Sequence, residues 1–232
     1  MTTASRREDF PFWSYFDLLM FIGVLFPCAA ASGIAAFILK PAIGVVLSTW
    51  AAQLSMYLLL AGWLYMLLKV RYGRDFWTSL GWTYPGFSII LYAIAGPLLL
   101  LAVQLLGAAL NTPVIDSPFR KLLDGRLSLA FFGVFSVILG PLIEELVFRG
   151  FLMPLLVRSY GVALGIIMTA IPFGLLHLAE NGWLWQYALL IGLAGAAFGW
   201  VRYRTGSTMA SAAIHSTYNL TMFAVMSLGG QF

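Results

Sequence analysis

The chain has 232 residues, of which 61% are hydrophobic and only 9% are charged, whereas soluble domains carry about 25% charged residues. This composition excludes an ordinary soluble domain and indicates an integral membrane protein. The formal net charge of +4 is small and scattered, so it favours loop contacts with anionic lipid headgroups and gives no support for nucleic-acid binding. The single cysteine, Cys28, excludes an internal disulfide and a cysteine-based metal site.

Long apolar runs follow one another along the whole chain. A membrane-spanning helix needs about 20 apolar residues, and the runs predict about seven such helices, with six to eight as the range. The sequence therefore predicts an all-α, polytopic helical bundle in which residues 1–232 form a single transmembrane domain. The expected spans are 17–39, 45–68, 87–110, 127–158, 162–178, 184–200 and 208–228.

Two segments depart from this simple pattern. In residues 116–126, charged residues alternate with Phe119, Leu122 and Leu123, which predicts a short helix lying on the membrane surface. The run 127–158 is longer than one span requires, so we expect it to tilt, break or protrude. Candidate kinks within this run are Pro141, Gly150 and Pro154.

A few ionisable residues remain inside the spans after the loop charges are set aside. Such residues are costly in a membrane and by default indicate a functional site. The chain has only two histidines, and both fall in apolar spans. The structural alternative is a buried ion pair that holds helices together. The residues concerned are Glu144, Glu145, Arg149, His177 and His215, with Asp17 at a span edge.

Helical spacing separates the two adjacent acids. Residues four apart share a helix face, so Glu145 and Arg149 are expected to form an ion pair. Glu144 points about 100° away from Glu145. The spacing therefore predicts a structural Glu145–Arg149 pair and leaves Glu144 as the free acid.

The expected depths bring an acid and a histidine together. Glu144 and His177 lie on either side of a turn near 160–161, and each is about 24 Å from it. A carboxylate facing a neutral imidazole can bind and deprotonate a water molecule. His215 and Asn219, four apart on the last span, can donate hydrogen bonds to a developing oxyanion. Together these groups can hydrolyse an amide without a serine or a cysteine.

Three motifs in these spans resemble the CPBP (ABI) family, which includes the type II CAAX prenyl endopeptidases (Rce1-like). The resemblance covers about residues 127–228, whereas the three N-terminal helices, 17–110, contribute only hydrophobicity. It implies an intramembrane glutamate protease that cleaves near the C-terminus of prenylated CAAX proteins. Some bacterial relatives are linked to bacteriocin maturation or self-immunity. The motifs are Glu144-Glu145-x-x-x-Arg149, Phe173-x-x-x-His177 and His215-x-x-x-Asn219.

The resemblance also implies a role for each motif residue. Glu144 would be the catalytic base, His177 would help to hold the water, and His215 with Asn219 would form the oxyanion hole. It implies a membrane-anchored protein or peptide as substrate, the lipid bilayer as surroundings and no cofactor. The expected location is the cell membrane, as in a bacterial inner membrane. The supporting residues would be Glu145, Arg149 and Phe173.

Two other interpretations remain open. In a zinc protease, Glu144, His177 and His215 would be the metal ligands, with an open position for water. In a protein without enzymatic activity, such as an immunity factor, a scaffold or a transporter, the polar cluster would serve the architecture. A transporter more often has two similar halves, which the sequence does not show.

The predicted topology conflicts with one implication of the resemblance. Seven spans with the N-terminus inside would place most of the basic residues in cytoplasmic loops. Glu144 would then lie toward the outer half of the membrane. The resemblance instead implies a site that opens to the cytoplasm, so either the hairpin protrudes or the spans are miscounted.

Overall fold

The computed structural model describes residues 10–115 and 125–228. Within these ranges every regular element is helical and no strand occurs, which confirms the all-α fold. The surface helix expected near 116–126 falls almost entirely on residues outside the described ranges. The helix α4, Arg126–Val134, begins at the last residue of that segment.

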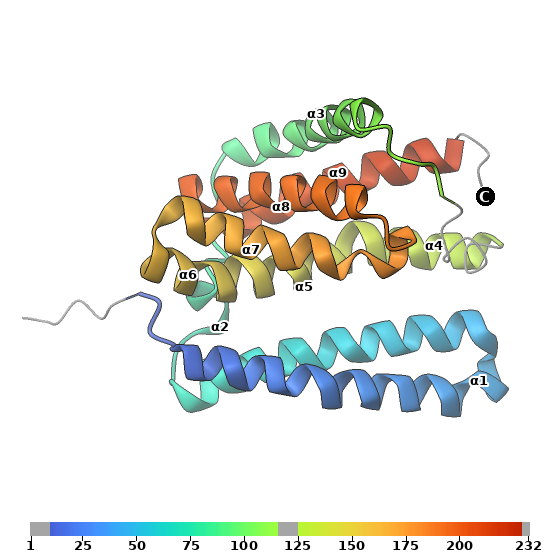
Figure 1. Cartoon of the computed structure of the whole chain (residues 1–232). Coiled ribbons are helices and arrows are strands. Elements are labelled where there is room, and N and C mark those ends of the chain that lie inside the picture. Colours follow the sequence, from blue (N-terminus) through green and yellow to red (C-terminus); the bar gives the residue numbers. More distant parts are fainter. Residues whose placement is uncertain (1–9, 116–124, 229–232) are drawn as a thin grey trace, which may run out of the picture.

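The first helix folds back on itself. α1 comprises Tyr15–Tyr65 and continues as the π-helical turn η1, Met66–Arg71. Within α1, Gly44 has φ +80° and ψ 172°, a conformation that side chains oppose and glycine tolerates. The chain reverses there, and Figure 1 shows two antiparallel limbs. These limbs correspond to the first two predicted spans.

The overlong fourth segment is one helical rod, Arg126–Tyr160. Two of its turns are π-helical, a feature that is frequent at functional sites. The rod therefore changes its winding without breaking, on both sides of the acidic motif. Its parts are α4, η3 (Phe135–Leu139), α5 (Gly140–Glu145), η4 (Leu146–Leu152) and α6 (Met153–Tyr160).

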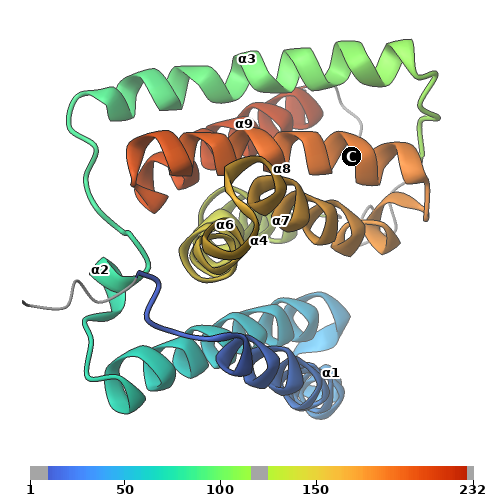
Figure 2. The ribbon, with the colours of Figure 1, turned by 60° about the vertical axis from the view of Figure 1, so that its left-hand side comes forward.

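The remaining helices build layers around this rod. α9 packs against α3 and α8, and α7 packs against α6 and α8. Figure 2 shows α3 on one side, then α8 and α9, then the rod with α7, and the α1 hairpin on the far side. The bounds are α2 Phe76–Ser79, α3 Ser88–Ala109, α7 Val162–Leu176, η5 Ala179–Asn181, α8 Trp185–Thr205 and α9 Thr208–Leu228.

Two buried apolar clusters hold the layers together, and η4 contributes to both. Leu146 and Phe151 pack with leucines of α1, whereas Phe148 packs with Phe173 and Phe198 of α7 and α8. The acidic pair Glu144-Glu145 therefore lies next to the junction of the two clusters.

The outer surface fits a membrane environment. In the described part of the chain, three helical segments are long and apolar enough to cross a membrane: Tyr15–Arg71, which contains both α1 limbs, Ser88–Ala109 and Arg126–Tyr160. Many large apolar side chains on these helices are exposed. Because soluble proteins rarely expose large apolar patches, these helices support the interpretation as a membrane protein.

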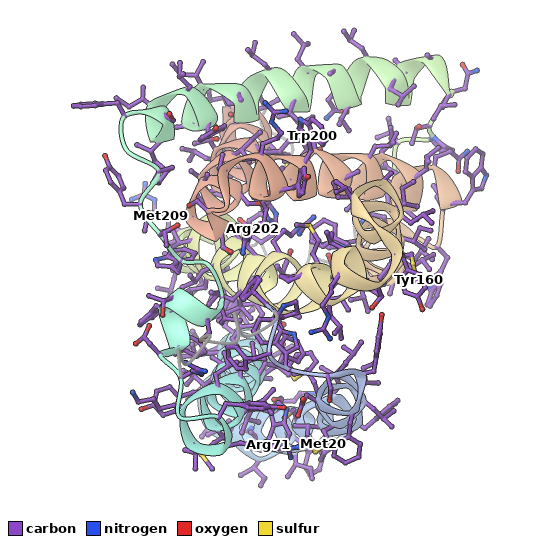
Figure 3. All side chains as sticks on the ribbon, turned by 90° about the vertical axis from the view of Figure 1, so that its left-hand side faces the viewer. Met20, Arg71, Tyr160, Trp200, Arg202 and Met209 are labelled. Carbon is purple, nitrogen blue, oxygen red and sulfur yellow. The ribbon has the colours of Figure 1, made fainter. Side chains whose placement is uncertain are left out.

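Helix ends gather on two opposite faces. Figure 3 looks onto the face where η1, α6 and α8 end, marked by Arg71, Tyr160 and Arg202. We call it the Tyr160 face. α7 runs away from it, so the opposite face carries η5 together with the turn at Gly44 (Figure 1).

Candidate active site

The predicted ion pair is present and fully buried. Nη1 of Arg149 lies 2.8 Å from Oε1 of Glu145, and neither side chain is exposed to solvent. Nη2 of the same arginine donates to the carbonyl oxygen of Gly195 at 2.6 Å. Its guanidinium carbon lies 4.4 Å from the ring centre of Phe173. A buried charge is tolerated when it is paired and hydrogen-bonded in this way.

Glu145 has two further partners that the sequence reasoning missed. The hydroxyl of Ser211 donates to Oε2 at 2.5 Å, and Nδ1 of His215 lies 2.9 Å from Oε1. Ser211 and His215 are four apart on α9, so their spacing alone could have placed them on one face. The Glu145 carboxylate therefore receives donors from Arg149, Ser211 and His215, and α9 is tied to the rod through it.

Glu144 is in a different situation from its neighbour. Its Oε2 is buried and has no hydrogen-bond partner among the described residues. Nε2 of His215 lies 3.9 Å from Oε2, and the side chain of Glu144 is 25% exposed. A buried acceptor without a partner is costly, so this oxygen is available to bind a proton donor such as water.

The ring of His215 is held in place by stacking and by hydrogen bonding. It stacks on Phe198 with ring centres 4.5 Å apart and planes 20° apart. Because the ionised carboxylate of Glu145 can only accept, Nδ1 carries a proton. Nε2 then accepts a hydrogen bond in the neutral ring and donates one only in the imidazolium.

His177 has a defined tautomer as well. It caps the C-terminal end of α7, and its Nδ1 lies 2.8 Å from the carbonyl oxygen of Phe173. A carbonyl oxygen only accepts, so Nδ1 is protonated and Nε2 of the neutral ring can accept a hydrogen bond from water. Within the described residues, no hydrogen bond or ion pair joins His177 to Glu144 directly.

Phe173 is the apolar centre around which these groups are arranged. Its ring centre lies 5.1 Å from that of His177 and 5.8 Å from that of His215. The close approach of α8 depends on Gly195, where an added Cβ would lie 2.7 Å from Cδ1 of Phe173 and 3.0 Å from Nη2 of Arg149. Phe173 thus contacts both histidines, and its supporting role in the site stays a prediction.

Asn219 has a structural partner that follows from Pro141. In the π-helical turn, Gly140 N–H bonds to the carbonyl oxygen five residues earlier, at Phe135. The next residue is Pro141, which has no N–H, so the carbonyl of Ser136 loses its partner. Nδ2 of Asn219 donates to that carbonyl at 2.7 Å. One amide proton of Asn219 is thus committed, and the second is available for another acceptor.

Glu180 is a third acid of this region that the sequence reasoning did not select. It lies in η5, three residues after His177. Its side chain is exposed, and partial desolvation by the neighbouring protein raises the pKa of its carboxyl group. The interaction with His177 lowers the pKa and the interaction with Glu144 raises it. Glu144, His177 and Glu180 therefore share one electrostatic neighbourhood toward the η5 face.

In the zinc alternative, the ligands would be Glu144, His177 and His215. In residues 10–115 and 125–228, no three His, Cys, Asp or Glu side chains are grouped so that they could hold a metal ion. Zinc dependence is therefore tested by measuring activity after chelation.

The protein is all-α, and its apolar helices are long enough to cross a membrane. Its buried Glu–Arg–His network places it in the class of membrane proteins with an internal polar site. Residues 126–221 match a family model described as Rce1-like, type II CAAX prenyl endopeptidase Rce1-like. This segment is an Rce1-like domain and contains all three motifs, which confirms the family expected from them. The family supports a membrane protease in general terms. No curated protein matched the chain, and no solved structure matched it.

Proposed function

We propose that this protein is a glutamate endopeptidase of the cell membrane that cleaves a membrane-anchored protein near a prenylated CAAX-type C-terminus. The observation that carries the proposal is the contrast between adjacent acids. Glu145 is satisfied by Arg149, Ser211 and His215, whereas the buried Oε2 of Glu144 has no partner in the described residues. An acid kept free beside a fully paired one is suited to act as a general base.

Water activation is assigned to Glu144 and His177. A water molecule can donate one hydrogen bond to the Glu144 carboxylate and the other to Nε2 of His177, which is free because Nδ1 donates to the carbonyl oxygen of Phe173. The lone pairs of the water oxygen then face the scissile carbonyl carbon. As the oxygen attacks, Glu144 takes the proton and a tetrahedral oxyanion forms.

Oxyanion stabilisation is assigned to His215 and Asn219. With Nδ1 of His215 bonded to Glu145, a donor at Nε2 requires the imidazolium form of the ring. Asn219 contributes the amide proton that Ser136 does not use. Donors placed where negative charge develops are often the largest catalytic contribution.

The reaction closes with one proton transfer. When the tetrahedral intermediate collapses, the C–N bond breaks and Glu144 gives its proton to the departing nitrogen. The products are a carboxylic acid and an amine, and Glu144 returns to the carboxylate. No covalent enzyme intermediate is needed, since water is the nucleophile.

The decisive experiment compares the C-termini of membrane proteins in cells that carry the wild type or Glu144→Ala. The proposal expects substrates that keep their terminal residues in the variant and lose them in the wild type. An unchanged set of C-termini, with both proteins present in the membrane at equal levels, would favour an immunity or scaffold role without catalysis.

A further inference from the structure

The N-terminal hairpin reaches the acidic motif, although it lies outside the matched segment 126–221. In the second limb of α1, Trp50 packs on Phe135 with ring centres 5.0 Å apart. Two turns further along, Tyr57 also contacts Phe135, at 6.1 Å. Phe135 opens the π-helical turn just before α5, so this limb runs beside the helix that presents Glu144.

A missing side chain at Gly140 connects Tyr57 to Glu144. A Cβ added at Gly140 would lie 3.3 Å from Oη of Tyr57 and 3.6 Å from Oε1 of Glu144. The phenol and the carboxylate therefore border the same small space, which glycine keeps open. The other carboxylate oxygen, Oε2, faces Nε2 of His215 at 3.9 Å. The two oxygens of Glu144 thus lie toward two different groups, Oε1 toward the Tyr57 hydroxyl and Oε2 toward His215.

The hydroxyl of Tyr57 is oriented by its own helix. The side chain of Gln53, one turn earlier, hydrogen-bonds to the phenolic oxygen, and the hydroxyl interacts electrostatically with Glu144 and Glu180. An amide that donates to the phenolic oxygen leaves the O–H proton free to point elsewhere. The acceptors that border the space at Gly140 are the carbonyl oxygen of Phe135, which already accepts from the Gly140 N–H, and Oε1 of Glu144.

Resting on the proposed function, we propose that Tyr57 is a positioning residue for Glu144. Its O–H is directed across the space above Gly140 toward Oε1 through one water molecule, and it fixes the carboxylate so that Oε2 receives the proton of the attacking water. Tyr57 transfers no proton itself. The N-terminal hairpin is thereby part of the hydrolytic site, and the matched segment alone does not hold the complete site.

The test uses the full chain in proteoliposomes and a fluorescence-quenched, farnesylated CAAX peptide as probe. Tyr57→Phe removes only the hydroxyl, so we expect kcat to fall about tenfold, as for loss of a hydrogen bond to a charged group, with KM and the unfolding midpoint unchanged. Tyr65→Phe is the matched control on the same helix, where the side chain contacts Phe76, and should retain wild-type kcat.

A coupling measurement separates positioning from a general structural effect. Glu144→Asp retracts the carboxylate from Tyr57, so adding Tyr57→Phe should cost little more, whereas independent effects would multiply. Gln53→Met removes the bond that orients the hydroxyl and should lower kcat less than Tyr57→Phe does. Its effect should disappear when Tyr57 is already phenylalanine.

The outcomes distinguish this inference from the function on which it rests. If the wild type cleaves the probe and Tyr57→Phe keeps its kcat, Tyr57 does not position Glu144. Multiplicative losses with Glu144→Asp would also overturn the inference. A wild type that leaves the probe intact would overturn the proposed prenyl-peptide activity, and the inference with it.

Discussion

Glu145 and His215 are 70 positions apart in the chain, and they share a hydrogen bond between Oε1 and Nδ1 of 2.9 Å. The acid that helical spacing assigns to architecture therefore also orients the imidazole that faces Glu144. Arg149 and His215 both donate to Oε1 of the Glu145 carboxylate, and Ser211 donates to Oε2. Stability and chemistry are linked through this one carboxylate, as in metal sites where a second group fixes a histidine.

Neutral substitution of the two acids should give opposite patterns. Glu144→Gln should keep the unfolding midpoint and lower cleavage by a factor of about 100 to 10,000, the usual contribution of a general base. Glu145→Gln leaves the buried charge of Arg149 without its counter-ion, so we expect the free energy of unfolding to fall by about 3 kcal/mol. Cleavage of a CAAX peptide and thermal unfolding in detergent measure the two effects.

The same pair of variants can contradict the assignment. Full cleavage by Glu144→Gln would show that another group activates the water. A stable Glu145→Gln variant would show that the buried network tolerates loss of its central charge. Both variants keep the side-chain volume, so packing changes do not confuse the comparison.

Much of the fold and part of the site could be predicted from local pattern. The apolar runs predicted the helices, and the i, i+4 spacing predicted the Glu145–Arg149 pair. Each of these features depends on a single segment of the chain. The bond from His215 to Glu145 and the bond from Asn219 to Ser136 depend on how α9 packs on the rod. They also depend on its π-helical turns, which shift the facing of each residue and have no clear pattern in the sequence. Tyr57 was missed for the same reason.

Arg149→Lys tests whether the geometry of the guanidinium matters beyond its charge. Arg149 donates to Glu145 with one nitrogen and to the Gly195 carbonyl with another, and it covers the ring of Phe173. Lysine cannot reproduce this fork. We expect a loss of about 2 kcal/mol in the free energy of unfolding, and wild-type stability for Arg204→Lys near the exposed end of α8. Equal stability of Arg149→Lys would reduce its role to charge.

Metal removal distinguishes the glutamate mechanism from the zinc alternative. The proposed mechanism uses a water held by Glu144 and His177 and predicts that cleavage survives prolonged treatment with EDTA and 1,10-phenanthroline. In a zinc enzyme the metal activates the water, and activity would disappear with chelation and return with added Zn²⁺. Metal analysis of the purified protein by mass spectrometry provides the independent readout.

Asn219 has two proposed roles, in the helix and in the oxyanion hole, and a compensating substitution can separate them. Asn219→Ala leaves the Ser136 carbonyl without a donor because Pro141 supplies none, so the free energy of unfolding should fall by about 1–3 kcal/mol. Restoring the backbone N–H with Pro141→Ala, in the double variant, should recover this stability. Cleavage should remain about 100 to 1,000-fold low, since the oxyanion donor is still missing. Pro141→Ala alone is the control and should cleave normally, because the Ser136 oxygen can accept two hydrogen bonds. A double variant that recovers both stability and cleavage would show that Asn219 serves only the helix and takes no part in the oxyanion hole.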